Sequence, residues 1–353
     1  MAERGHLMPT QTATTPTTPR PVTTERRDLV VALAGLWPTA GLYLDGWAHT
    51  HVPEMETFFT PWHAVLYSGF VVHACSLVTT ELYRQPQRGA IRGRVPAGYG
   101  LGLIGAMLFA VGGLVDMLWH SLLGIEVDIE ALLSPPHLLL LTAGTLMIAT
   151  PLRAAGFRRD EPVGSLRWLP AILSMFAATA AAAFFLEYLS PLLDAPVASD
   201  HGSAPALGVG EYLLTTMLLV VPVLFAWARL GRVPPGMIIA VGLAVTVPVG
   251  VFNDFEYLAG QLWALAGAVF ADVLLHVVGT RQPRLIPVLA GVAVPALVWP
   301  LHLLGVEITV GIAWTVELWG GVIVLCGLAG AVLGGLFLPY LAIGTRPSGP
   351  AGR

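Results

Sequence analysis

The sequence contains no lysine, and only 11% of its 353 residues are charged. In soluble domains, roughly a quarter of the residues carry a charge. Hydrophobic residues make up 55% of the chain, and the mean hydropathy is +0.73. Such a chain lacks the polar surface that a water-soluble protein of this length needs, so the composition excludes a soluble globular protein.

Cysteine is almost as scarce. The two cysteines, Cys75 and Cys326, both lie within apolar segments and form no CxxC motif. This pattern excludes a zinc ribbon, a thioredoxin-like redox motif and a disulfide-rich scaffold. The chain also offers no segment in which a cupredoxin-like domain could be placed.

Long apolar segments are abundant instead. A transmembrane helix needs about 20 predominantly apolar residues. About ten segments meet this requirement, at 29–48, 61–82, 98–122, 135–156, 167–189, 210–230, 235–257, 260–279, 285–304 and 312–340. We therefore predict an all-α, polytopic integral membrane bundle of about ten transmembrane helices.

The apolar segments also suggest an organisation for the chain. Residues 1–27 are rich in Thr and Pro and are expected to be a disordered tail. Residues 28–156 are predicted to form a four-helix metal-binding repeat unit and residues 157–345 a six-helix membrane unit. Residues 346–353 are expected to be a second tail.

The 18 cationic residues are all arginine, and a ten-helix topology places every one of them on the same side of the membrane. The positive-inside rule then predicts that both termini are cytoplasmic. The opposite, extracytoplasmic side carries acids and histidines, which suits a divalent metal or another cation. A simpler explanation for the missing cations is the positive-inside bias alone.

Two extracytoplasmic segments share one pattern. In each, an aspartate precedes a histidine by four residues, and a hydroxyl residue, a proline and a second histidine follow. The pattern occurs at Asp45, His49, Thr60, Pro61 and His63, and again at Asp116, His120, Ser134, Pro135 and His137. Residues four apart share one helical face, and a hydroxyl residue before proline is typical of a helix start. Each hairpin is therefore predicted to bring together one carboxylate and two imidazoles.

This ligand set suits copper, zinc or non-haem iron. The alternative is that these residues only cap helices and anchor them at the membrane interface. Because the pattern occurs twice, we favour a metal or proton role. His51, Glu56 and Glu130 are candidates to hydrogen-bond the ligand histidines. The two glutamates are equally well explained as acids placed just before a helix N-terminus.

The first segment resembles the copper-binding signature of the C subunit of particulate methane and ammonia monooxygenases. The resemblance rests on Asp45 and His49, followed by Phe59-Thr60-Pro61-Trp62-His63 and Tyr67. The second segment is similar to the next hairpin of that family, with Asp116 standing where the family has asparagine. The resemblance covers about residues 40–150.

The resemblance implies one copper site at Asp45, His49 and His63, and a second, nearby site at Asp116, His120 and His137. Copper is the cofactor that it implies, ahead of zinc or iron, in a component of a copper-dependent monooxygenase. It further implies an oligomer in the lipid bilayer, with partner membrane subunits or a cupredoxin-type protein. No nucleic-acid partner is expected. The resemblance assigns no catalytic residue to this chain.

Two other functions remain open on the sequence alone. One is a copper or other cation transporter, in which Asp272, His276 and Glu317 form a proton or ion path. For the first two of these residues, a buried polar pair between helices is an equally good explanation. The other function is a zinc-dependent membrane hydrolase, which needs three ligands and an open position for water.

Overall fold

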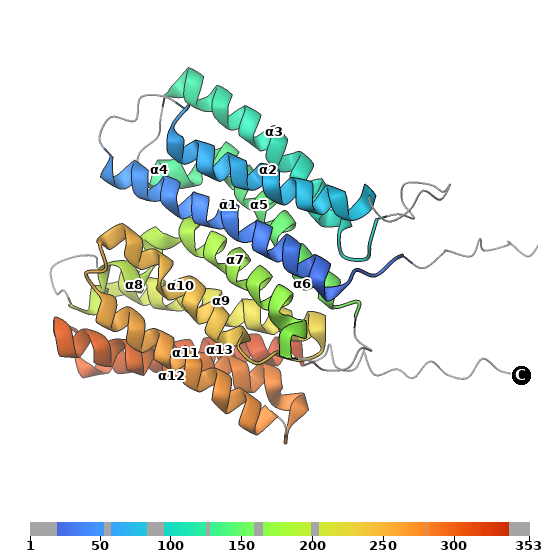
Figure 1. Ribbon diagram of the computed structural model, residues 1–353. Coiled ribbons are helices and arrows are strands. Elements are labelled where there is room, and N and C mark those ends of the chain that lie inside the picture. Colours follow the sequence, from blue (N-terminus) through green and yellow to red (C-terminus); the bar gives the residue numbers. More distant parts are fainter. Residues whose placement is uncertain are drawn as a thin grey trace, which may run out of the picture.

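The computed structural model describes residues 20–52, 58–82, 95–124, 128–158, 165–198, 205–279 and 281–338. Every regular element within these ranges is a helix. The long helices lie side by side in one bundle (Figure 1). The prediction of an all-α bundle is therefore confirmed, whereas most of the two expected tails lies outside the described residues.

Eight helical segments in the described ranges are long and apolar enough to cross a membrane. They are α1 (Glu25–His51), α2 (Pro61–Leu82), α3 (Gly100–Leu123), α5 with α6 (Pro135–Ile148 and Thr150–Ala155), α9 (Pro205–Leu230), α11 (Leu258–Gly279), α12 (Ile286–Thr309) and α13 (Val316–Phe337). Between α5 and α6, proline at position 151 fits the break in the helix, because proline removes a backbone donor. The chain is thus a multi-pass membrane protein.

The two remaining apolar segments form shorter helices. Residues 167–189 contain η2 (Ser165–Trp168) and α7 (Leu169–Phe185), and residues 235–257 contain α10 (Met237–Thr246) and η5 (Pro248–Asn253). Pro248 has no backbone N–H and its ring clashes with the preceding turn, so the α-helix ends before it. All ten apolar segments are helical, but eight reach spanning length in the described part of the chain.

Short elements connect the long helices at the ends of the bundle. They are α4 (Asp128–Leu133), η3 (Glu187–Leu189), α8 (Pro191–Asp194), η4 (Pro196–Ala198) and η6 (Pro283–Leu285). Of these, α4 joins the α3–α5 hairpin, while η3 and α8 follow α7. They therefore lie where the chain turns back into the bundle.

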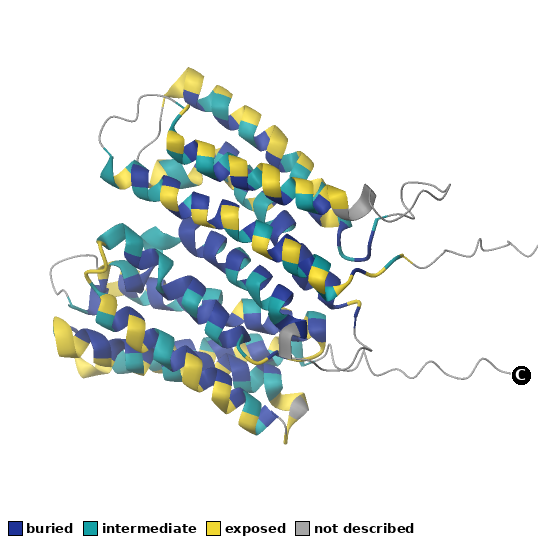
Figure 2. Ribbon diagram, in the orientation of Figure 1, coloured by how far each residue is buried: buried dark blue, intermediate teal, exposed yellow. Residues whose placement is uncertain are grey.

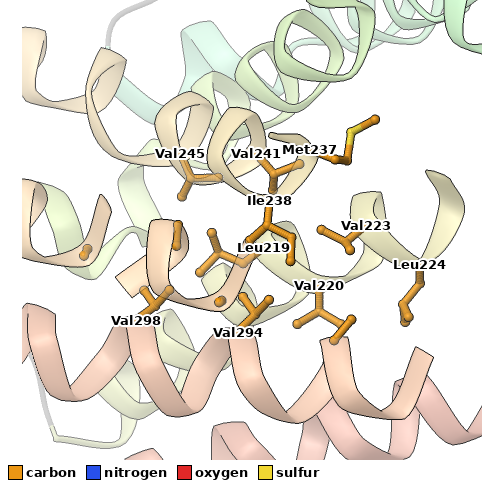
Figure 3. Packing of buried hydrophobic residues seen from close by; sticks show 14 of the residues in the cluster. Leu219, Val220, Val223, Leu224, Met237, Ile238, Val241, Val245, Val294 and Val298 are labelled. Carbon is orange, nitrogen blue, oxygen red and sulfur yellow. The ribbon is translucent and has the colours of Figure 1, made fainter. Parts of the chain in front are cut away.

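The bundle has two main apolar cores. The larger one packs α9, α10 and α12 together, and Figure 3 shows Leu219, Ile238 and Val294 from these three helices in the same cluster. The smaller core lies between α1, α2, α3 and α5 and includes Phe109 and Met147. Helix α1 packs against both α2 and α7, so it joins the two halves.

The outer helices expose apolar side chains. Helices α3 and α13 carry many exposed residues (Figure 2). On α13 these include Val324, Leu328, Val332 and Leu336, which are four residues apart and share one face. Lipid tails are as apolar as leucine, so such a face is stable in a bilayer and would not be stable in water.

The described arginines lie at the end of the bundle where α1 begins and α13 ends (Figure 1). Arg158 is buried there and pairs with the buried Asp28 of α1. Tyr99 donates a 2.6 Å hydrogen bond to the same carboxylate. Nearby, the Arg229 guanidinium donates to the Arg153 carbonyl oxygen at 2.7 Å. The repeated Asp/His pattern lies at the opposite end of the bundle.

Candidate metal centre

The first triad joins α1 to the start of α2. Asp45 and His49 lie one turn apart on α1, and Asp45 Oδ2 is 3.8 Å from His49 Nε2 and 3.3 Å from His63 Nε2. Thr60 Oγ1 accepts the His63 backbone N–H at 3.1 Å, which confirms the expected helix cap. His63 Nδ1 lies 2.5 Å from the Phe58 carbonyl oxygen. Because a carbonyl only accepts, Nδ1 holds the proton and Nε2 is available to a metal.

The second triad repeats this arrangement between α3 and α5. Asp116 Oδ1 lies 3.3 Å from His120 Nε2 and 3.1 Å from His137 Nε2. His137 Nδ1 contacts the Ala131 carbonyl oxygen, again leaving Nε2 toward the carboxylate. The side-chain cap that we expected from Ser134 is not formed. Its hydroxyl group contacts His137 Nδ1 at 3.0 Å and makes no capping hydrogen bond.

Both triads fit a metal ion. Within each, one ligand atom from every residue lies within 4.8 Å of the others, so a single ion can reach all three. Asp45 Oδ1 is buried and has no hydrogen-bond partner among the described residues. A buried carboxylate oxygen without a partner is unfavourable. A bound cation would satisfy it, and the donor set is one that transition metals accept.

The two triads are neighbours. The ring centroids of His63 and His120 are 6.3 Å apart, and the Phe58 ring lies 4.9 Å from the first and 6.1 Å from the second. Tyr67 donates a 3.1 Å hydrogen bond to Asp116 Oδ2, so a residue of the first hairpin supports the ligand of the second. The sequence alone did not reveal that Phe58 and Tyr67 link the two triads, because this role depends on contacts between the two hairpins.

Two glycines set the distance between α1 and α2. A Cβ atom at Gly41 would lie 2.7 Å from Leu66 Cα, and one at Gly69 would lie 2.6 Å from the Pro38 nitrogen. Real Cβ atoms do not approach backbone this closely. The close packing that glycine permits is what brings Asp45 within reach of α2.

The two triads differ in environment. The side chain of Asp45 is 11% exposed, whereas that of Asp116 is 2% exposed. Asp116 also has three partners, since Tyr67 adds to the two histidines. The repeated sequence pattern therefore produces one more open site and one more enclosed site.

A cavity of about 690 Å³ lies next to both triads. All three residues of the first triad line it, as do Asp116 and His137 of the second. The remaining wall is mainly apolar and comes mostly from α1, α2, α3, α4, α5 and α7. Small-molecule sites are concave and mostly apolar, with a few polar groups that fix the ligand.

Two of the residues expected to support the ligands, His51 and Glu130, lie elsewhere. The His51 ring stacks on Trp47 at 4.9 Å, and its Nε2 atom is 3.7 Å from Asp254 Oδ1. Glu130 is exposed on α4, and Glu56 lies outside the described residues. In the described residues, the backbone carbonyl oxygens of Phe58 and Ala131 contact Nδ1 of His63 and His137.

The expected ion path is not one connected group. Asp272 accepts the backbone N–H groups of Gly236 and Ile238, each at 3.0 Å, and so caps the start of α10. His276 Nδ1 lies 2.7 Å from the Asp272 carbonyl oxygen. Glu317 is exposed in the first turn of α13, at the opposite end of the bundle from this pair. The contacts of Asp272 and His276 are those of a structural polar pair.

A further acid lies beside the cavity. Glu187 of η3 lines it just beyond the end of α7. Burial raises the pKa of this carboxyl group to about 8, because burial disfavours the charged form. Glu187 is therefore mostly protonated at neutral pH.

No family model matches this chain, and neither a curated protein nor a solved structure does.

Proposed function

We propose that this protein is a copper-binding integral membrane protein that takes part in the oxidation of a small apolar substrate. One observation carries the proposal: two neighbouring Asp/His/His triads open onto one apolar cavity inside a membrane protein. The resemblance of the same residues to the C subunit of particulate methane and ammonia monooxygenases supports copper as the metal.

Each residue has a definite part in this proposal. Asp45, His49 and His63 would hold one ion, and Asp116, His120 and His137 would hold a second. Copper, when bound, supplies redox chemistry with dioxygen that no side chain can supply. The carbonyl oxygens behind His63 and His137 hold Nδ1 of each ring, which would leave Nε2 to bind the ion. The apolar wall of the cavity would take up the substrate and exclude water.

The placement of charge supports an orientation for the protein. If α7 and α10 with η5 also cross the membrane, the chain has ten passes and both termini share a side. The positive-inside rule places the arginine-rich end in the cytoplasm. The metal triads then face the extracytoplasmic side of the cell membrane. Partner membrane subunits or a cupredoxin-type protein would complete an oligomeric enzyme.

The test is the identity and amount of bound metal. Wild-type protein is expected to take up about two copper ions per chain, one at each three-residue ligand set. His63→Ala and His137→Ala should each lose about one ion, because each removes one ligand from one triad. His276→Ala is the matched control, since it removes a histidine far from both triads.

Mass spectrometry of the metal content and electron paramagnetic resonance of the copper-loaded protein give the readout. Wild-type protein that cannot take up copper would contradict the proposal. Zinc bound at the same residues, with no uptake of copper, would favour the membrane hydrolase instead. Copper flux into proteoliposomes would favour the transporter.

A further inference from the structure

His73 is a buried polar residue that the proposed metal sites do not use. It lies in the middle of α2, only 1% of its surface is exposed, and it lines the cavity. Neither ring nitrogen has a hydrogen-bond partner among the described residues. The backbone carbonyl oxygens of Val31 and Met147 lie beside the ring and interact with it. Buried polar groups without a partner are rare, and each needs an explanation.

The position of His73 defines the inner end of the cavity. It follows His63 by ten residues on the same helix, which is about 15 Å along the axis. Between these two histidines the wall is mainly apolar and includes Leu66, Phe70 and Phe109. The cavity therefore has metal ligands at one end, an imidazole at the other and an apolar surface between them.

The size of the cavity favours a substrate with a chain. Its volume of about 690 Å³ lies within the range of pockets that hold small organic ligands. A water-sized molecule takes up about 30 Å³ in a liquid. A single molecule of methane or ammonia would fill only a small part of the space.

The charged residues around the cavity indicate which polar group a bound ligand would carry. Asp45, Asp116 and Glu187 line it, and none of its described lining residues is an arginine. A carboxylate in the ligand would meet acids and no fixed cation. An uncharged hydroxyl group both donates and accepts, and a neutral imidazole offers one donor and one acceptor.

We propose that the cavity binds a linear medium-chain alcohol, with its hydroxyl group hydrogen-bonded to His73 and its far carbon end beside the triads. The anchor would fix which end of the chain faces the metal. This substrate class rests on the proposed function, but binding of the alcohol requires no metal. Metal-free protein can therefore test the anchor by itself.

The first experiment measures binding to metal-free protein in lipid nanodiscs. Wild-type protein should bind octanol more tightly than octane. His73→Phe keeps an aromatic ring but removes the polar atoms, so octanol should bind about tenfold more weakly while octane binding stays unchanged. His73→Gln should keep the preference for octanol, because its amide also donates and accepts. Phe70→Leu, which reshapes the wall without changing its polarity, is the matched control.

The second experiment maps the orientation by photolabelling with two octanol derivatives. A diazirine next to the hydroxyl group should label residues near Phe70 and Met147. A diazirine at the far end should label residues near Asp45 and Tyr67. In His73→Phe the two derivatives should give the same mixed pattern.

Two results would overturn the proposal: equal octanol binding in wild type and His73→Phe, or labelling in the reverse order. The unchanged octane binding shows that the variant is folded. Copper content is measured on the same preparations. If copper uptake fails while the His73 effect is present, only the proposed function is lost. If copper binds and the His73 effect is absent, only the anchor is lost.

Discussion

Removal of one hydroxyl group should weaken one of the two metal sites and spare the other. Tyr67 donates a 3.1 Å hydrogen bond to Asp116 Oδ2, while the first triad meets only its ring, at a centroid distance of 6.3 Å from His63. Tyr67→Phe deletes the donor and keeps the ring. The Asp116 carboxylate would then lose the one partner that is not a metal ligand.

The expected size of the effect follows from this contact. A hydrogen bond to a charged group contributes about 1.5–3 kcal/mol, and each 1.4 kcal/mol is a tenfold change in affinity. Copper affinity at the Asp116 triad should therefore fall about 10- to 100-fold, the range found when outer partners of metal ligands are removed. Copper affinity at the Asp45 triad should stay within a factor of about two. Tyr67 meets this triad only through its ring, and the phenylalanine ring keeps that contact.

Copper titration against a competing chelator measures both affinities, and electron paramagnetic resonance distinguishes the two sites. Tyr43→Phe is the matched control, because the Tyr43 hydroxyl donates to the Ala180 carbonyl oxygen and to no triad residue. Equal weakening of both triads, or no weakening at either, would refute the assignment of Tyr67 to the second site.

Three further predictions concern stability. Gly41→Val should lower the melting temperature, with a loss of about 1–3 kcal/mol from overpacking against α2. Gly100→Ala is the control and should leave the melting temperature unchanged, because an added Cβ atom there would have no neighbour within 4 Å. Asp28→Asn leaves Arg158 buried without its counter-charge and should cost about 3–5 kcal/mol in thermal unfolding, whereas an unchanged melting temperature would show that this pair is dispensable. Glu187 has a pKa of about 8, so the wild type should lose stability as the pH rises from about 4.5 to 8, because the carboxyl ionises in the unfolded chain while it stays protonated in the folded protein. Melting curves of Glu187→Gln should lack this loss, and an identical pH profile would contradict the raised pKa.

The triads could be predicted from the sequence because their geometry is local. A spacing of four residues places Asp45 and His49 on one helical face, whatever surrounds the helix. Proline after a hydroxyl residue marks the start of the returning helix and places His63 in its first turn. The structure brings these residues together as expected, and does the same for Asp116, His120 and His137.

The features that the sequence did not reveal depend on contacts between distant segments. Asp272 and His276 have the same spacing as the metal ligands, but Asp272 caps α10, whose start lies more than 30 residues earlier in the chain. Likewise, the apolar segment 235–257 has the composition of a spanning helix. Its packing gives a short α10 followed by a 3-10 turn from Pro248 onward. Spacing and hydropathy carry no information about such partners.

The repeated pattern also conceals a difference between the two sites that bears on their roles. Structural metal sites are closed, whereas catalytic sites keep a position open. Asp45 is the more exposed of the two aspartates, and all three residues of its triad line the cavity. Asp116 is more deeply buried and is also bonded to Tyr67. We therefore expect the Asp45 triad to be the one that meets the substrate, and the Asp116 triad to hold its metal more tightly and to support its neighbour. The expectation fails if the alcohol perturbs only the copper signal of the Asp116 triad, the site that Tyr67→Phe weakens.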